Sequence, residues 1–450
     1  MGIKSRKDQK SWKELIPNNK SALTQIFSSL RSRNYRLYFI GQSISLIGTW
    51  MQQVAMSWLI YRLTGSVLLL GTVAFINQIP SFLISPFAGV ITDRFERRRI
   101  MLVTQALCMV EAFSLAVLVF TGLIQVWHIL SFALFVGIVV AFDAPTRQSM
   151  VVELVDRKED LSNAIALNSA MFNAARLIGP SVAGILIALI GEGYCFLLNG
   201  SSYLAVIGAL LMIRMPKYLK KEKQENILAG FVEGFRYCFR NLPIRALLMM
   251  VALLSLAGQP FLVLVPAFAK DVLGGDSHTQ GFILSSFGAG ALMAAIYLAA
   301  RKSVLGLGKV VSLMGVVFGL GLAAVSHITA HWLVFLLLVP TGFGMVAMLA
   351  SCNTLLQTLT DDDKRGRVMG FYAMAMMGMA PFGSFLFASV AEWIGVPDTL
   401  LAGGIVVAAG ALYFENWRPV VRRMARNVRV KKGIVPEIAR GIDLELKIEN

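Results

Sequence analysis

Residues 310–360 read VVSLMGVVFGLGLAAVSHITAHWLVFLLLVPTGFGMVAMLASCNTLLQTLT, a run of 51 positions without an Asp, Glu, Lys or Arg. About 20 apolar residues span a hydrocarbon core as a helix, so this run is long enough for two crossings. Uncharged runs of more than twenty residues also include Leu37–Tyr61, Ala246–Ala269 and Val368–Ala391. With 56% hydrophobic and 15% charged residues, the sequence predicts an all-α polytopic membrane protein and excludes a soluble one.

We expect twelve membrane-spanning helices, divided six and six by a polar central stretch. The first six are predicted at Leu37–Tyr61, Leu68–Thr92, Ile100–Thr121, Trp127–Gln148, Leu161–Ile190 and Tyr194–Ile213. The last six are predicted at Ala246–Ala269, Gln280–Ala300, Lys309–His327, Trp332–Gln357, Gly366–Trp393 and Thr399–Trp417. The predicted units are therefore an N-terminal tail (1–35), a first six-helix bundle (36–213), a central loop (214–245), a second bundle (246–418) and a C-terminal tail (419–450).

The basic residues are distributed unequally across the predicted membrane. When the twelve predicted spans are placed across the membrane in alternating directions, 39 of the 42 Lys and Arg residues fall on one side. Basic loops mark the cytoplasmic side, so we expect both termini in the cytoplasm and the protein in the inner (plasma) membrane. Basic loops that contact anionic membrane lipids account for the net charge of +16, so no nucleic-acid partner is expected. The four cysteines are scattered and indicate neither a disulfide framework nor a metal site, and we expect no cofactor.

The two halves of the chain resemble each other weakly. The fifth predicted span contains Gly179-Pro180 and the eleventh contains Ala380-Pro381, and polar residues stand at the beginning of both spans. Repeated six-helix units favour a pseudo-symmetric transporter whose substrate site lies between the halves near mid-membrane. Chance similarity between two Gly-rich membrane helices is the alternative at this point.

The loop between the second and third predicted spans carries the most specific motif, Gly89-Val-Ile-Thr-Asp93-Arg94-Phe-Glu-Arg97-Arg98-Arg99. It resembles the G-x-x-x-D-R-x-x-R-R signature of the major facilitator superfamily. A cluster of basic residues that ends a membrane span would explain the arginines, but not the glycine and the aspartate at this spacing. The resemblance implies two pseudo-symmetric six-helix bundles. It also implies a cytoplasmic latch in which the aspartate faces the start of the eleventh helix, here Arg365–Val368.

A second match lies in the fifth span, where Ala175-Arg-Leu-Ile-Gly179-Pro180-Ser-Val-Ala-Gly184 is similar to the Gly-Pro motif of the superfamily's antiporters. The motif implies a kinked helix that packs closely against the other half, and it favours export. The match departs from the pattern at Ala175, where a glycine is common. Small residues and prolines are frequent in any membrane helix, which is the structural alternative.

Within the superfamily, Arg33-Asn34-Tyr35-Arg36, Gly41-Gln42 and Asp143-Ala-Pro145-Thr-Arg147 most resemble the enterobactin-exporter and macrolide-efflux branch. This resemblance implies export of siderophores or amphiphilic drugs. The second-half copy of the loop signature has decayed to Ala299-Ala-Arg301-Lys302, which argues against two equivalent latches.

Ionisable side chains near mid-membrane are costly and indicate function. Glu111 lies twelve residues past Arg99, or about 18 Å into the membrane, and Arg176 is at comparable depth on the fifth span. Glu111 is either a carrier of the coupling proton or the ion partner of Arg176, and Arg176 is also a candidate to attract an anionic substrate. Asp143 and Arg147 are one helical turn apart, and we interpret them as a pair that supports the cytoplasmic latch.

The first, fourth, seventh and tenth helices line the cavity in the superfamily, and two polar residues before Pro80 are positioned to break the second helix. The candidate cavity-lining residues are Gln52, Gln53, Met56, Asn77, Gln78, Gln259, Phe261, Asn353 and Gln357.

The sequence thus predicts a monomeric secondary transporter, a proton-coupled exporter of a small amphiphilic molecule that works by alternating access in contact with membrane lipids. No phosphate-binding G-x-x-x-x-G-K-[ST] loop occurs, so ATP would have to act through another subunit. A lipid flippase or an uptake carrier of the same fold remains an alternative. A membrane enzyme or sensor is less favoured, because no cluster of catalytic polar residues is found.

Overall fold

The computed structural model describes residues 28–92, 95–214, 227–301, 304, 306–361 and 364–431. Within these ranges the chain forms helices and no strand. The first half contains a short 3-10 helix Ser28–Arg31 and then α2 (Arg33–Thr64), α3 (Val67–Thr92), α4 (Arg97–Phe120), α5 (Val126–Glu153), α6 (Leu161–Ile190) and α7 (Glu192–Met212). The second half contains α8 (Ile227–Arg240), α9 (Leu242–Leu253), α10 (Pro260–Ala267), α11 (Ser277–Ala300), α12 (Leu307–Val325), α13 (His331–Leu359), α14 (Arg365–Ala373), α15 (Met379–Ile394), α16 (Val396–Phe414) and α17 (Arg418–Lys431).

Each predicted span coincides with a helix or with a broken helix of the structure. Eleven of them, in the described part of the chain, are long and apolar enough to cross a membrane. The exception is α2, whose glutamines and hydroxyl side chains lower its mean hydropathy although Leu37–Tyr61 is uncharged. Because α2 has 32 residues and packs along both α6 and α7, we retain it as the first of twelve spans.

The seventh and eleventh spans are interrupted by π-helical turns that the sequence did not reveal. In the seventh span Leu254–Gly258 separates α9 from α10, and a second π turn, Phe268–Val272, follows α10. In the eleventh span Met374–Gly378 separates α14 from α15. The first and third of these turns lie just ahead of Pro260 and Pro381. A proline lacks the N–H that continues α-helical bonding, so a widened turn absorbs the break.

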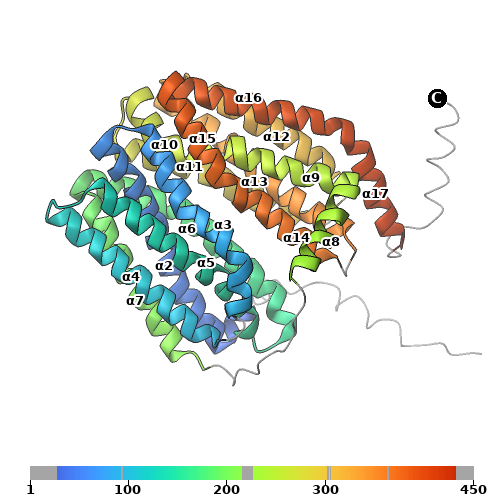
Figure 1. Cartoon of the computed structure of the whole chain (residues 1–450), viewed down its shortest axis with the longest axis horizontal. Coiled ribbons are helices and arrows are strands. Elements are labelled where there is room, and N and C mark those ends of the chain that lie inside the picture. The colour runs from blue at the N-terminus through green and yellow to red at the C-terminus, as the bar shows by residue number, and fades with distance from the viewer. Residues whose placement is uncertain are drawn as a thin grey trace, which may run out of the picture.

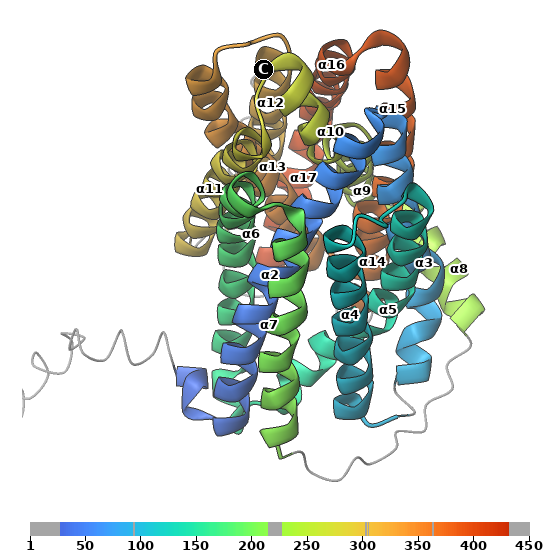
Figure 2. The ribbon, with the colours of Figure 1, turned by 90° about the vertical axis from the view of Figure 1, so that its left-hand side faces the viewer.

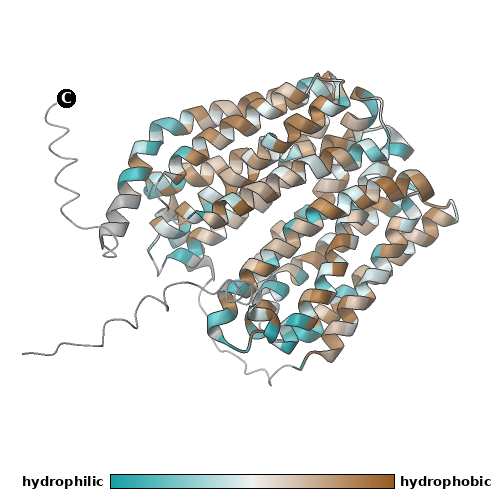
Figure 3. Ribbon diagram, turned by 180° about the vertical axis from the view of Figure 1, so that it is seen from behind, coloured by the Kyte–Doolittle hydropathy of each residue, from teal (hydrophilic) through white to brown (hydrophobic). Residues whose placement is uncertain are grey.

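The helices form the two six-helix bundles implied by the resemblance. In the first bundle α2 packs on α6 and α7, α3 packs on α5, and α4 packs on α5 and α7. In the second bundle α13 packs between α11 and α12, and α12 also packs on α16. The main contacts between the bundles are α6 with α11 and α3 with α15, which Figure 1 and Figure 2 show side by side. Apolar residues cover most of the length of the helices, and polar residues gather at their ends (Figure 3).

We call the side of the molecule that carries most of the basic residues the basic side, and the other the opposite side. Residues 214–245 of the basic side were predicted as a loop, but α8 forms there and α9 already begins at Leu242. Residues 215–226 lie outside the described part. The predicted C-terminal tail also begins as a helix, since α17 extends to Lys431, and residues 432–450 are outside the described part.

Candidate functional site

A chain of hydrogen-bonded polar side chains crosses the first bundle and has Glu111 at one end. The Nε2 of Gln52 on α2 donates to both carboxylate oxygens of Glu111 on α4, at 2.8 and 3.1 Å. The Oε1 of Gln52 accepts a hydrogen bond of 2.7 Å from the Nδ2 of Asn199 on α7. Glu111 is 2% exposed and Asn199 is 1% exposed. We call these three residues the Glu111 network. It joins three helices of one bundle through Gln52, and Glu111 is its one carboxylate.

Close packing fixes the geometry of the Glu111 network. A Cβ atom on Gly48 of α2 would lie 2.6 Å from the Oδ1 of Asn199 and from the Oγ of Ser202. Gly48 is one turn before Gln52, so the absence of a side chain there lets α2 approach α7 closely enough for the Gln52–Asn199 bond. Sequence reasoning named Glu111 and Gln52 separately and missed Asn199. The polar side chain of Asn199 in the apolar sixth span was the signal that could have found it.

Arg176 lies on α6, and its nearest described partner is an aromatic ring. Its guanidinium carbon is 5.7 Å from the centre of the Trp50 ring, which is within the range of a cation–π contact. Between Glu111 and Arg176, both of which the structure describes, there is no ion pair. The ion-pair interpretation of Glu111 is therefore wrong for this conformation, because Gln52 occupies the carboxylate and Trp50 covers the guanidinium.

Asp143 and Arg147 form an ion pair on α5 with a distance of 3.7 Å between Oδ2 of Asp143 and Nη2 of Arg147. The shorter contacts of Asp143 go to α4, where Thr104 Oγ1 and Gln105 Nε2 each donate to its Oδ1 at 2.8 Å. Asp143 is 5% exposed. It therefore anchors α5 to α4, as well as pairing with Arg147 within its own helix.

The predicted cytoplasmic latch lies mostly beyond what the structure describes. Asp93 and Arg94 are outside the described residues, and Gly89 lies in α3 where no side-chain surroundings are described. Arg97 pairs with Glu153 at the end of α5, and Arg98 donates to the carbonyl of Leu210 at 2.7 Å. These two arginines hold the start of α4 against the first bundle. The latch between the bundles remains a prediction.

The Gly179-Pro180 motif lies inside α6, where the helix passes between α2 and the second bundle. A Cβ atom on Gly179 would lie 2.5 Å from the Cβ of Trp50, so this glycine lets α2 approach. A Cβ atom on Gly184 would lie 2.8 Å from the carbonyl oxygen of Ser277 and 3.0 Å from the Cα of Gly281 on α11. Gly179 therefore packs against α2 of the first bundle, and Gly184 packs against α11 of the second bundle.

The candidate cavity residues of the first bundle have different surroundings. Gln53 is exposed and Met56 is half-buried against the core. Asn77 donates to the Ala133 carbonyl of α5 at 3.1 Å, and Gln78 donates to its own helix at 3.3 Å. The helix α3 continues past these two residues and Pro80 to Thr92, so the predicted break of the second helix is wrong.

In the second bundle, Gln259 follows the first π turn and donates to Ser255 at 3.1 Å. Asn353 and Gln357 of α13 are hydrogen-bonded to each other, and Gln357 is exposed. Phe261 is 1% exposed and packs on Phe287, with ring centres 5.6 Å apart. Phe261 is therefore part of the core in this conformation and does not line a cavity.

The sequence did not predict the polar contacts that close the opposite side between the bundles. The hydroxyl of Tyr61 on α2 donates to Asp271, and Lys270 lies 5.5 Å from the centre of the Tyr61 ring. Gln280 of α11 donates to the hydroxyl of Ser57 at 2.9 Å. The adjacent charges of Lys270 and Asp271, on a side otherwise poor in basic residues, were the available signal.

The sequence profile of a family described as "Transmembrane secretion effector" matches residues 24–437. The chain is 26% identical to the "Staphyloferrin A transporter" of Staphylococcus aureus, over 84% of this chain and 96% of that protein. It is 23% identical to the "Multidrug efflux pump Tap" of Mycolicibacterium fortuitum, over 78% and 87%. It is 22% identical to the "Macrolide efflux protein A" of Streptococcus pyogenes, over 84% and 95%.

Two solved structures share the fold at 14% identity. A bacterial homolog of the human lysosomal transporter Spinster, in an inward-facing and unoccupied conformation, aligns with a TM-score of 0.67 over 88% of this chain and 98% of its own. The nucleoside transporter NupG, as a D323A mutant, aligns with a TM-score of 0.65 over 86% and 99%.

Proposed function

Because this chain belongs to the transmembrane secretion effector family of the major facilitator superfamily, we propose that it is a proton-driven exporter of a small amphiphilic molecule. Membership of this family makes the chain a multi-pass membrane transporter of the efflux type and not an enzyme. The proposal adds the coupling ion, the direction and the class of substrate. It also places the basic side and both termini in the cytoplasm, with the protein acting as a monomer.

The single observation that carries the coupling proposal is the Glu111 network. An ionised Glu111 accepts both hydrogen bonds from Gln52, whereas a protonated carboxyl loses one acceptor site and the strengthening that the negative charge gives. Protonation therefore loosens the link between α4 and α2. A lone carboxylate at mid-membrane, without a described cation beside it, suits reversible proton binding better than a permanent ion pair does.

The helix α2 connects this proton site to the contacts that close the opposite side. Gln52 is five residues before Ser57, about one and a half turns, and Tyr61 lies about one turn further along the same helix. Ser57 and Tyr61 make the contacts with Gln280 and Asp271 of the second bundle. Protonation of Glu111 would release α2 from α4, and the released helix would break its contacts on the opposite side. This sequence of events couples one proton to one opening of the transporter.

The environment of Arg176 favours an anionic or zwitterionic substrate. Its guanidinium lies over the Trp50 ring, and within the described part of the chain it has no carboxylate partner. A half-buried cation with unused N–H donors attracts carboxylates, and the adjacent indole offers an apolar surface. A siderophore fits this combination of charge and apolar surface, and one relative is a staphyloferrin A transporter. Amphiphilic drugs are the second class to test, since two relatives are drug efflux proteins.

Flux measurements in proteoliposomes test this function. The purified chain would be reconstituted with a panel of carboxylate and catecholate siderophores and a macrolide. We expect gradient-driven movement of at least one of them, and replacing Arg176 by Gln should raise the KM for a carboxylate siderophore at least about tenfold with Arg176→Lys less affected. Gradient-driven movement of none of them would contradict the proposal.

Asp271→Asn should destabilise closure of the opposite side. The substitution removes the charged acceptor of the Tyr61 hydroxyl, and a hydrogen bond to a charged group contributes about 1.5–3 kcal/mol. We expect a cysteine placed at Ser181, which faces Ser285 across the bundles, to react about tenfold faster with a membrane-impermeant maleimide applied from the opposite side. Asp276→Asn is the matched control, because Asp276 caps α11 through Thr279 and has no hydrogen bond or ion pair to the first bundle among the described residues. Equal labelling rates in the two variants would contradict a closing role for Asp271.

A further inference from the structure

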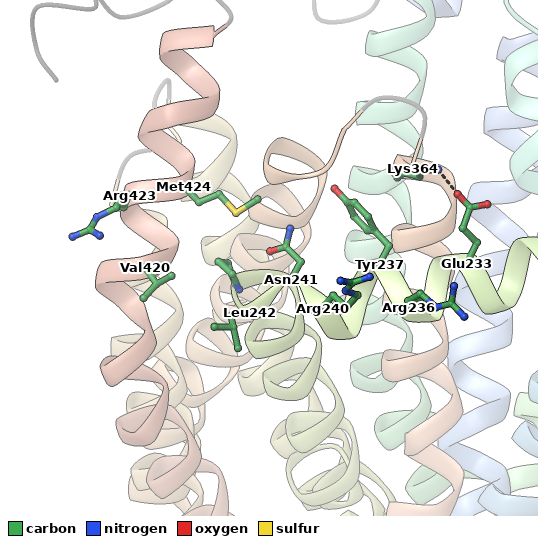
Figure 4. Close-up of a pocket in the computed structure, with 11 residues that line it drawn as sticks. Glu233, Arg236, Tyr237, Arg240, Asn241, Leu242, Lys364, Val420, Arg423 and Met424 are labelled. Carbon is green, nitrogen blue, oxygen red and sulfur yellow. Dashed lines mark hydrogen bonds and ion pairs between the residues drawn. The ribbon is translucent and has the colours of Figure 1, made fainter.

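A groove of about 700 Å³ lies on the basic side between α8 and α17, away from the Glu111 network. Figure 4 shows its two walls, with Arg236, Tyr237 and Arg240 on α8 and Arg423 and Met424 on α17. The full lining is Glu233, Arg236, Tyr237, Arg240, Asn241, Leu242, Pro243, Lys364, Val420, Arg423 and Met424. Four of these residues are basic and one is acidic, so the groove carries a net positive charge.

The single acid of the groove is already neutralised by partners on the α13–α14 connection and on α14. The ammonium of Lys364 contacts Glu233, and the guanidinium of Arg367 lies 2.6 Å from its other carboxylate oxygen. The hydrogen bond from Lys364 holds the pKa of the Glu233 carboxyl below its usual range, so this acid stays ionised and paired. Arg236 and Arg240, both exposed on α8, have no ion pair or side-chain hydrogen bond within the described ranges. Two neighbouring guanidinium groups are therefore available to an external anion.

An exposed apolar stripe runs along α8 beside these arginines. Val232, Phe235 and Phe239 are 54%, 47% and 46% exposed, and their spacing places them on one face of the helix. The rings of Phe235 and Phe239 stack with centres 4.3 Å apart. The buried face of α8 is fixed against α14, because a Cβ atom on Gly234 would lie only 3.0 Å from the Phe371 ring. The stripe therefore stays exposed, next to the arginines, as in helices that lie at a membrane surface.

We propose that this groove binds the phosphate of an acidic phospholipid, with Arg236 and Arg240 as the groups that contact the phosphate. Two arginines four residues apart on one helix face can each donate to the same phosphate oxygens. Arg423 stands on the opposing wall, with its side chain directed away from α8 (Figure 4). The stripe of α8 then packs among the acyl chains of the same leaflet. A free phosphate would meet the arginines but leave the stripe in water, so the apolar surface favours a lipid as the source of the anion.

Native mass spectrometry of the full chain tests this site. The chain would be released from detergent after titration with phosphatidylglycerol, and the occupancy of the first bound lipid would be measured. We expect Arg236→Gln/Arg240→Gln to weaken binding of this first lipid at least about tenfold, because each basic residue near an anionic surface contributes measurably to lipid binding. Arg236→Lys/Arg240→Lys should retain most of the affinity. Phosphatidylcholine, which has no net charge, should not fill the site in the unaltered protein.

Arg157→Gln/Arg422→Gln is the matched control, because it removes the same charge from exposed positions of the basic side that do not line the groove. Circular dichroism would verify that all variants fold. Equal affinity for phosphatidylglycerol in both double variants would overturn the proposal. Displacement of the lipid by millimolar inorganic phosphate would also overturn it, since it would show a site for a free anion. These outcomes do not depend on the direction or the coupling of transport.

Discussion

Glu111→Gln is expected to abolish transport driven by a pH gradient while the protein still folds and binds its substrate. The amide keeps the shape of the side chain, and its oxygen still accepts one hydrogen bond from Gln52, so the variant mimics the protonated carboxyl and should fold. The variant cannot take up or release a proton, so the coupled step is blocked. We expect gradient-driven flux to fall to the level of protein-free liposomes, measured as initial rates with and without the imposed gradient.

Substrate exchange at equal pH serves as the internal control for Glu111→Gln, because exchange needs no net movement of protons and should continue. Glu192→Gln is the matched variant. Glu192 is also a buried acid of the first bundle, but it pairs with Arg62 at 2.7 Å near the opposite side. The Glu192→Gln variant should retain transport driven by the pH gradient. If Glu111→Gln responded to the gradient as the unaltered protein does, Glu111 would not be the proton site.

Gly184→Val is the second substitution with a large expected effect. Its Cβ atom would meet the backbone of Ser277 and Gly281 at 2.8 and 3.0 Å, and backbone atoms of two packed helices cannot move aside locally. The α6–α11 contact must therefore separate, which prevents closure of the opposite side. We expect the initial rate of export to fall at least about tenfold, while a cysteine at Ser285 becomes more reactive from the opposite side.

Gly208→Val is the control for this clash, since a Cβ atom at Gly208 of α7 meets no atom of the described residues within 4 Å. It should transport at close to the normal rate when compared at equal amounts of protein in the membrane. Normal export by Gly184→Val would show that the contact of α6 with α11 need not form in the transport cycle.

The spans and their order were predictable because they depend on hydrophobicity along the chain. The fifth predicted span, Leu161–Ile190, has the same bounds as α6. The helix α8 was missed because the central stretch was judged by its charges, whereas its apolar residues recur at helical spacing. The π turns were missed because Pro260 and Pro381 indicate a break without indicating how the backbone compensates.

The candidate site was only partly predictable. Depth along a helix identified Glu111 and Arg176 as unusual, but depth says nothing about which face of a helix a residue occupies. Glu111 and Arg176 therefore looked like possible ion partners, although Gln52 and Trp50 are their neighbours in the structure. The contacts of Tyr61 with Lys270 and Asp271 join residues about 210 positions apart, and no local pattern contains that information.

Export of substrate into inside-out vesicles with an acidic lumen is the most direct test of proton-driven export. In these vesicles the basic side faces the external medium, so an antiporter carries substrate inward as protons leave the lumen. The account predicts that acidifying the lumen accelerates accumulation of a siderophore or macrolide, and that Glu111→Gln removes this acceleration. Accumulation at the same rate with and without the gradient, in vesicles that do transport the substrate, would contradict it.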